Sequence, residues 1–180
     1  MNRTVRGKLK IAHYSRAARA LFLGALLSAV PAAAQETPLT RQVEARVLAL
    51  VNEFRAGEGL KPLEREARLD QAADDFADFM ARAGLLDHRA DGTTPPARVA
   101  RRGYAYCELA ENIGMEYDSR GFTVERLARA LVQGWRDSPV HRANMLHATA
   151  TQTGVGVSRN AQGEYYAAQL FARPRPCGGR

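Results

Sequence analysis

A hydroxyl and an imidazole stand three residues apart at Ser138 and His141, a pairing that could supply a nucleophile and its base. Pro139 follows the serine directly, and Ser-Pro is typical of the cap and first position of a helix. The chain also contains no Gly-x-Ser-x-Gly turn, which presents the nucleophile in many serine hydrolases. We therefore expect Ser138 to cap the backbone N–H of His141, and we predict no serine nucleophile.

The other imidazoles and acids show no spacing that identifies a metal site. The sequence lacks a His-Glu-x-x-His helix, and its chemically capable residues come from separate segments. Taken singly, His88 could bind carbonyl oxygens near a helix end, where a partly cationic ring is favoured. Glu111 alone is interpreted as an acid in an irregular segment, and we expect His147 on the surface or in a loop.

The two cysteines, Cys107 and Cys177, could form a disulfide in an oxidising compartment. Such a bridge would close a loop of 70 residues and contribute about 4 kcal/mol through chain entropy. Cys177 lies in a tail rich in Pro and Gly, so two free thiols or an intermolecular bridge remain alternatives.

Apolar residues at helical spacing predict the elements that must position these side chains. The first helix spans Val43 to Phe54 with Thr40 as a possible cap, and the second spans Leu69 to Ala83 and ends at Gly84. We expect a short helix at 97–102, a helix capped by Thr123 that contains Trp135, and one more turn from Ser138. The basic cluster Arg98, Arg101 and Arg102 is interpreted as a solvated helix face.

The pattern changes to period two near the C-terminus. Val155 and Val157 alternate with Gly154, Gly156 and Ser158, and a second strand returns through Tyr165 to Phe171 after a turn at 160–163. A further strand is predicted near Tyr104 to Cys107. Helices followed by a hairpin indicate an α+β fold in which helices pack on a small antiparallel sheet.

The N-terminal 34 residues have the features of an export signal. They contain six of the 26 basic residues and none of the 19 acidic ones, followed by an apolar run and small residues before Gln35. The run is shorter than the roughly 20 residues that span a bilayer, so we expect cleavage after Ala34 and no remaining membrane anchor. The exported chain is nearly neutral, which gives no reason to expect a nucleic-acid partner.

An ordered series of motifs resembles the CAP superfamily, the cysteine-rich secretory, antigen 5 and pathogenesis-related proteins that share the SCP domain. The resemblance is closest to its bacterial secreted branch and covers roughly Val47 to Phe171. The motifs are Leu50-Val51-Asn52-Glu53-Phe54-Arg55 followed by Leu60-Lys61-Pro62-Leu63, His88 before Asp91-Gly92, Arg98 with Gly103-Tyr104, Ala110-Glu111-Asn112-Ile113, Trp135-Arg136-Asp137-Ser138-Pro139-Val140-His141-Arg142, Gly154-Val155-Gly156-Val157 and Gln169-Leu170-Phe171.

The resemblance implies an α-β-α sandwich with a central antiparallel sheet between two helical layers. Its domain would occupy residues 43–172, after a signal at 1–34 and a leader at 35–42, with a tail at 173–180. The resemblance also implies a cleft formed by His88, Glu111 and His141. Eukaryotic members tend to have a glutamate where this chain has Ser138, so the fourth position of the cleft departs from that pattern.

Two imidazoles and one carboxylate could bind a divalent metal, with zinc the first expectation. On this basis His88, Glu111 and His141 are the predicted ligands, and no catalytic residue is assigned. The resemblance favours a secreted, non-enzymatic binding module for a lipid, a sterol-like molecule or another small apolar or envelope ligand. A metal-dependent hydrolase acting on peptide, lipid or envelope material is the alternative. The exported chain could remain in a periplasm or leave the cell, and its oligomeric state stays open.

Overall fold

The computed structural model describes residues 38–177, which belong to one compact unit. The predicted signal at 1–34 lies outside the described residues. None of the helices in 38–177 is long and apolar enough to cross a bilayer. In chain order, the elements are α1 (Leu39–Gly57), β1 (Glu64–Arg65), α2 (Ala67–Ala83), α3 (Pro95–Arg101), β2 (Tyr106–Glu116), α4 (Val124–Asp137), α5 (Pro139–Met145), β3 (Gln152–Arg159) and β4 (Tyr165–Pro174).

The four strands form one sheet in the order β1-β3-β4-β2. The predicted hairpin is confirmed, because β3 and β4 are antiparallel and pair Val155 with Gln169. β2 is also antiparallel to β4 and pairs Glu111 with Leu170. Only the two-residue β1 is parallel to its neighbour, β3. The sheet is therefore antiparallel over nearly all of its length, as predicted.

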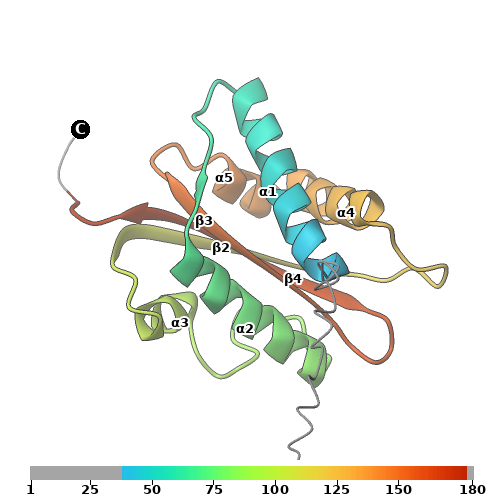
Figure 1. The fold of residues 1–180 in the computed structure, drawn as a ribbon. Helices are drawn as coiled ribbons and strands as arrows, with labels where there is room; N and C mark the ends of the chain where they lie inside the picture. Colours follow the sequence, from blue (N-terminus) through green and yellow to red (C-terminus); the bar gives the residue numbers. More distant parts are fainter. Residues whose placement is uncertain (1–37, 178–180) are drawn as a thin grey trace, which may run out of the picture. The chain divides into compact units, whose positions relative to one another are not determined.

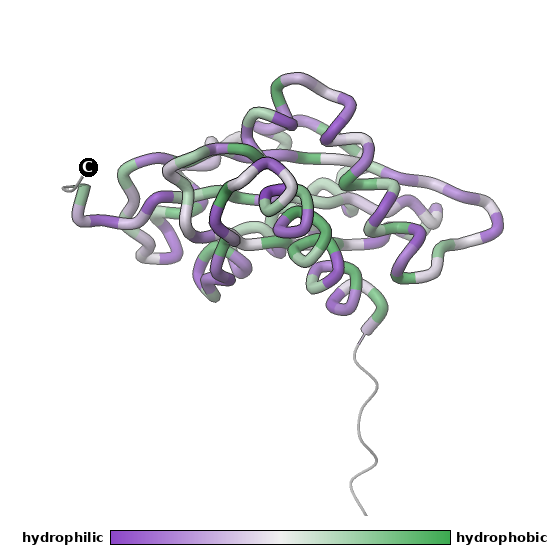
Figure 2. The backbone as a smooth tube through the Cα atoms, turned by 90° about the horizontal axis from the view of Figure 1, so that it is seen from above, coloured by the Kyte–Doolittle hydropathy of each residue, from purple (hydrophilic) through white to green (hydrophobic). Residues whose placement is uncertain are grey.

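Two separate hydrophobic cores lie on the two faces of the sheet. The alternation of β4 sends Ala167 and Phe171 into a core shared with α1 and α4, and sends Ala168 and Leu170 into a core shared with α2 and α3. In Figure 1, α1, α4 and α5 lie above the sheet, and α2 and α3 lie below it. Hydrophobic and hydrophilic residues alternate along these elements (Figure 2). The arrangement is the predicted α-β-α sandwich.

Several predicted helix boundaries are confirmed, and others are corrected. Thr123 accepts a hydrogen bond from the backbone N–H of Arg126, and Gly84 ends α2 in the left-handed conformation. The proposed Thr40 cap is wrong, because α1 begins at Leu39 and its N-cap position is Pro38, which has no side chain able to cap. α1 therefore takes in the second half of the expected leader.

The strand predicted near Tyr104 to Cys107 is real but much longer. It is β2, which runs on to Glu116 and therefore contains Glu111. The prediction that Glu111 lies in an irregular segment is wrong. Apolar and polar residues do not alternate cleanly along β2, since its side chains face two different helical layers and polar partners.

The structure joins Cys107 at the start of β2 to Cys177 beyond the end of β4 in a disulfide. The Sγ of Cys107 also approaches the carbonyl oxygen of Pro174 at 3.5 Å. Because β2 and β4 are already paired, the bridge holds the C-terminal segment to the end of the sheet.

Direct backbone contact between α2 and β3 requires glycine at two strand positions. A Cβ atom added to Gly154 would lie 2.1 Å from the carbonyl carbon of Leu69, and one added to Gly156 would lie 2.3 Å from that of Ala73. No side chain can fit between the helix and the strand at these positions. The alternation of glycine and valine in β3 thus places α2 directly against the sheet.

Gly156→Ala should lower the free energy of unfolding by about 3 kcal/mol or more, because the new methyl group meets helix backbone that cannot move aside without shifting α2. Urea unfolding measures the effect. The control is Gly134→Ala in α4, where the nearest atom to a new Cβ is 4.0 Å away. There alanine should stabilise by about 1 kcal/mol through helix propensity. Equal stability of the two variants would contradict the packing argument.

Candidate functional site

Glu111 is the centre of the predicted cleft and is almost completely buried, with 7% of its surface exposed. It lies on β2, and its carboxylate receives three hydrogen bonds. Nη2 of Arg98 donates to both oxygens, at 2.9 and 2.7 Å, and Nδ1 of His88 lies 2.8 Å from Oε1. A buried carboxylate needs such partners, since removal from water without them is costly.

Arg98 of α3 is the main partner of that carboxylate, and only 6% of its surface is exposed. Its Nη1 donates to the carbonyl oxygen of His88 and to Oδ1 of Asp91, both at 3.2 Å. Its guanidinium also stacks 3.4 Å from the ring centre of Phe76. The interpretation of Arg98 as part of a solvated face is therefore wrong. α3 has only seven residues, so its sequence pattern does not show which of its arginines points inward.

His88 lies in the loop between α2 and α3, and its side chain is 48% exposed. Glu111 forms an ion pair with Arg98, and the carboxylate of such a pair can only accept hydrogen bonds. The proton of a neutral His88 ring is consequently on Nδ1. This arrangement leaves the lone pair of Nε2 free to bind a ligand.

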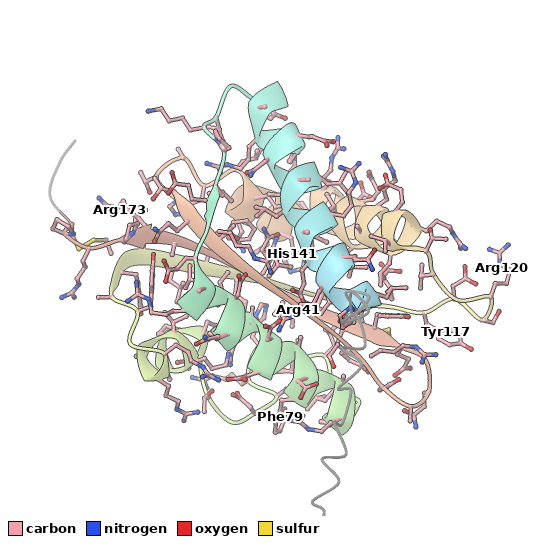
Figure 3. The ribbon with its side chains drawn as sticks, viewed as in Figure 1. Arg41, Phe79, Tyr117, Arg120, His141 and Arg173 are labelled. Carbon is pink, nitrogen blue, oxygen red and sulfur yellow. A yellow bond between two sulfur atoms is a disulfide. The ribbon has the colours of Figure 1, made fainter. Side chains whose placement is uncertain are left out.

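His141 lies in the first turn of α5, near the sheet (Figure 3). Burial lowers the pKa of His141, and the charge on nearby His88 lowers it further. Both effects favour a neutral His141 ring at neutral pH. The two imidazoles therefore lie near enough for a charge on one to disfavour a charge on the other.

Two asparagines that sequence reasoning did not select position this part of the cleft. The side-chain amide of Asn112 on β2 donates to the carbonyl oxygen of His141 at 3.1 Å. The amide of Asn144 on α5 donates to the carbonyl oxygen of Glu111 and to Oδ1 of Asn112. Asn112 stands next to Glu111 in the sequence, which is the one signal that could have identified it.

Ser138 does not take the role that its position suggested. It is the N-cap residue of α5, but its hydroxyl makes no capping hydrogen bond. Its backbone carbonyl instead accepts the N–H of Arg142 at 2.8 Å. The prediction that the Ser138 side chain caps His141 is wrong, because the contact between Ser138 and α5 is made by the main chain.

The hydrogen bonds of Glu111 bear on the expected set of three metal ligands. No group of three His, Cys, Asp or Glu residues within the described range 38–177 has an arrangement that could hold a metal ion. Both oxygens of Glu111 already contact Arg98, so the carboxylate orients His88 instead of facing the open cleft. His88 and His141 are the two side chains left with the chemistry of ligands. His147 lies outside this group and contacts Glu108 at 3.4 Å.

Arg98→Met should lower the free energy of unfolding by about 3–5 kcal/mol, because it leaves the buried carboxylate of Glu111 without a cation. Arg101→Met is the matched control on the same helix. Arg101 is exposed and should change stability by no more than about 0.5 kcal/mol. Chemical denaturation compares the two variants, and similar losses in both would show that the Arg98 contact does not stabilise the fold.

Comparison with known proteins agrees with the geometry. The model of the Cysteine-rich secretory protein family, CAP, matches residues 48–171. The uncharacterized protein YkwD of Bacillus subtilis is 28% identical over 137 residues, which are 72% of this chain and 50% of that protein. The chain therefore spans about half the length of this relative.

Two solved structures illustrate the shared fold. An outer surface protein of Borrelia burgdorferi has a TM-score of 0.66 at 18% identity, covering 76% of this chain and 96% of its own. An extracellular protein containing a SCP domain from Bacillus anthracis has a TM-score of 0.60 at 23% identity, covering 74% of this chain and 41% of its own. With the family model matched over most of the sandwich, this chain belongs to the CAP family of cysteine-rich secretory proteins.

Proposed function

We propose that this protein is an exported, non-enzymatic binding module whose cleft binds a divalent cation, zinc in particular, through His88 and His141. One observation carries the proposal. Arg98 and Glu111 fix the ring of His88 so that Nε2 is free, and the adjacent His141 ring has a lowered pKa. Neutral imidazoles with a fixed orientation are good ligands for zinc.

Two protein ligands leave the remaining coordination positions of such a cation to water or to an oxygen of the bound molecule. The cation would then connect the module to a ligand with an anionic or carbonyl group, such as an envelope component. A solved structure with the same fold, with a TM-score of 0.51 and 14% identity, is described as NaASP2 with Zn2+. That similarity shows the fold alone, so support for zinc binding by this chain comes from its own imidazoles.

The contacts of the cleft favour binding over hydrolysis. A general base must have an accessible lone pair within reach of the proton it removes. The carboxylate of Glu111 is buried and shared between Arg98 and His88. Glu111 is therefore unsuited to act as the general base that the alternative, a metal-dependent hydrolase, would need.

Export is part of the proposal because the N-terminal 34 residues have the composition of a signal. The structural relatives from Borrelia burgdorferi and Bacillus anthracis are described as an outer surface and an extracellular protein. An exported chain of this kind would meet its ligand in the periplasm or outside the cell.

Calorimetric titration of the chelator-treated protein should show one zinc site at pH 7.5 that is lost in both His88→Ala and His141→Ala. His147→Ala should bind like the unmodified protein, because His147 contacts Glu108 and Thr149 away from the cleft. Affinity should fall at acidic pH, where protons compete with zinc for the imidazole nitrogens. Undiminished zinc binding in the two cleft variants would refute the assignment.

A second candidate function is the binding of an acyl chain, and a groove between α1 and α4 favours it. Hollows of about 420 and 340 Å³ overlap there, and Leu50 and Val132 contribute to both. The guanidinium of Arg136 lies 4.6 Å from the ring centre of Phe54 at this groove. Glu53, Glu58 and Arg129 also line the larger hollow, so an acyl chain would contact Leu50, Phe54 and Val132 while its carboxylate meets Arg136.

Displacement of a fluorescent fatty acid tests this second candidate. Arg136→Glu should weaken binding about tenfold, because it replaces an attractive charge by a repulsive one at the rim of the groove. Arg120→Glu changes the net charge equally at a distant, exposed loop and should have less than about a twofold effect. Failure of the unmodified protein to bind fatty acid saturably would eliminate acyl chains as ligands while leaving the zinc site untouched.

A further inference from the structure

A third hollow lies between α2 and α3, on the face of the sheet opposite the α1–α4 groove. Its volume is about 410 Å³, within the range of sites for small molecules. We call it the α2–α3 pocket, and its lining residues are Ala72, Asp75, Phe76, Phe79, Arg82, Asp91, Arg98, Arg101 and Arg102. It shares Arg98 with the cleft but contains neither His88 nor His141.

The apolar surface of the α2–α3 pocket is aromatic. Phe76 is buried, and the guanidinium of Arg98 is stacked on its ring. Phe79 is only partly buried and lies in the layer below the sheet (Figure 3). A partly exposed ring in a hollow provides a surface on which a flat apolar group can pack.

The charged side chains of the pocket have an excess of cations, with four arginines against two aspartates. Arg98 already forms ion pairs with Asp91 and Glu111. Arg102 pairs with Asp75, and Arg82 pairs with Asp78, but these pairs are solvent-exposed and therefore weak.

Arg101 differs from the other three arginines. It is exposed, and no carboxylate pairs with it among residues 38–177. A planar guanidinium without a partner can bind a carboxylate, sulfonate or phosphate through two parallel hydrogen bonds. Arg101 and the partly buried ring of Phe79 line the same hollow.

We propose that the α2–α3 pocket is a binding site for a small aromatic anion. The flat body of the ligand packs on Phe79, and its anionic group binds Arg101, with Arg102 and Arg82 adding positive charge at the rim. The site lies beyond the proposed cation site and requires no metal. A small anion suits the pocket better than an acidic peptide, because the volume of the hollow matches that of a small-molecule site.

Two-dimensional amide NMR titration with 2-naphthoate tests the proposal on the purified, metal-free protein. The expected result is saturable binding with shifts centred on α2 and α3. Inorganic phosphate supplies charge without the aromatic body, and 2-naphthalenemethanol supplies the body without charge. Each should bind about tenfold more weakly than 2-naphthoate, because each loses one of the two contacts.

Arg101→Met should weaken 2-naphthoate binding about tenfold, and its exposed position should leave the fold intact. Phe79→Leu should weaken binding by several-fold while keeping an apolar side chain at the half-buried position. Arg136→Met, in the α1–α4 groove, should bind like the unmodified protein. The proposal is overturned if Arg136→Met rather than Arg101→Met weakens binding, if phosphate binds as tightly as 2-naphthoate, or if a short polyglutamate peptide binds the α2–α3 face and 2-naphthoate does not.

Discussion

The site depends on one buried charge, the carboxylate of Glu111. β2 places this carboxylate among apolar residues of the lower core, where an unpaired anion would be strongly destabilising. Arg98 and His88 supply the compensation, and each comes from a different segment. The single charge therefore links the sheet, α3 and the loop before α3. The contacts that offset the free-energy cost of burying this carboxylate also fix the orientation of the His88 ring.

The two helical layers come together near the Glu111 carboxylate at the unpaired edge of β2. β2 pairs only with β4, so its other edge needs partners from outside the sheet. The indole N–H of Trp135 donates to the carbonyl oxygen of Ile113 at 2.9 Å, and Asn144 donates to that of Glu111. These contacts hold α4 and α5 against the edge. His141 is thereby held on the strand that carries Glu111, the partner of His88.

The helices pack differently on the two faces of the sheet. The valines of β3 face α1, whereas its glycines let α2 contact the strand backbone directly. The α1–α4 groove and the α2–α3 pocket lie on opposite sides of this sheet. Both combine arginine with phenylalanine, but only the α2–α3 pocket shares a residue, Arg98, with the cleft. A bound anion there would lie next to the buried pair that orients His88.

The sequence alone determined the helices and the β3–β4 hairpin, because repeating apolar patterns are properties of the chain, and the family resemblance of its motifs supplied the expectation that His88, Glu111 and His141 share a cleft. It did not determine that Arg98 points inward, that β2 extends through Glu111, or that Asn112 and Asn144 hold α5. Those outcomes depend on partners distant in sequence, such as the carboxylate of Glu111 for Arg98. Which charged and polar side chains pair with one another depends on which of them are buried side by side. Only the tertiary structure determines that.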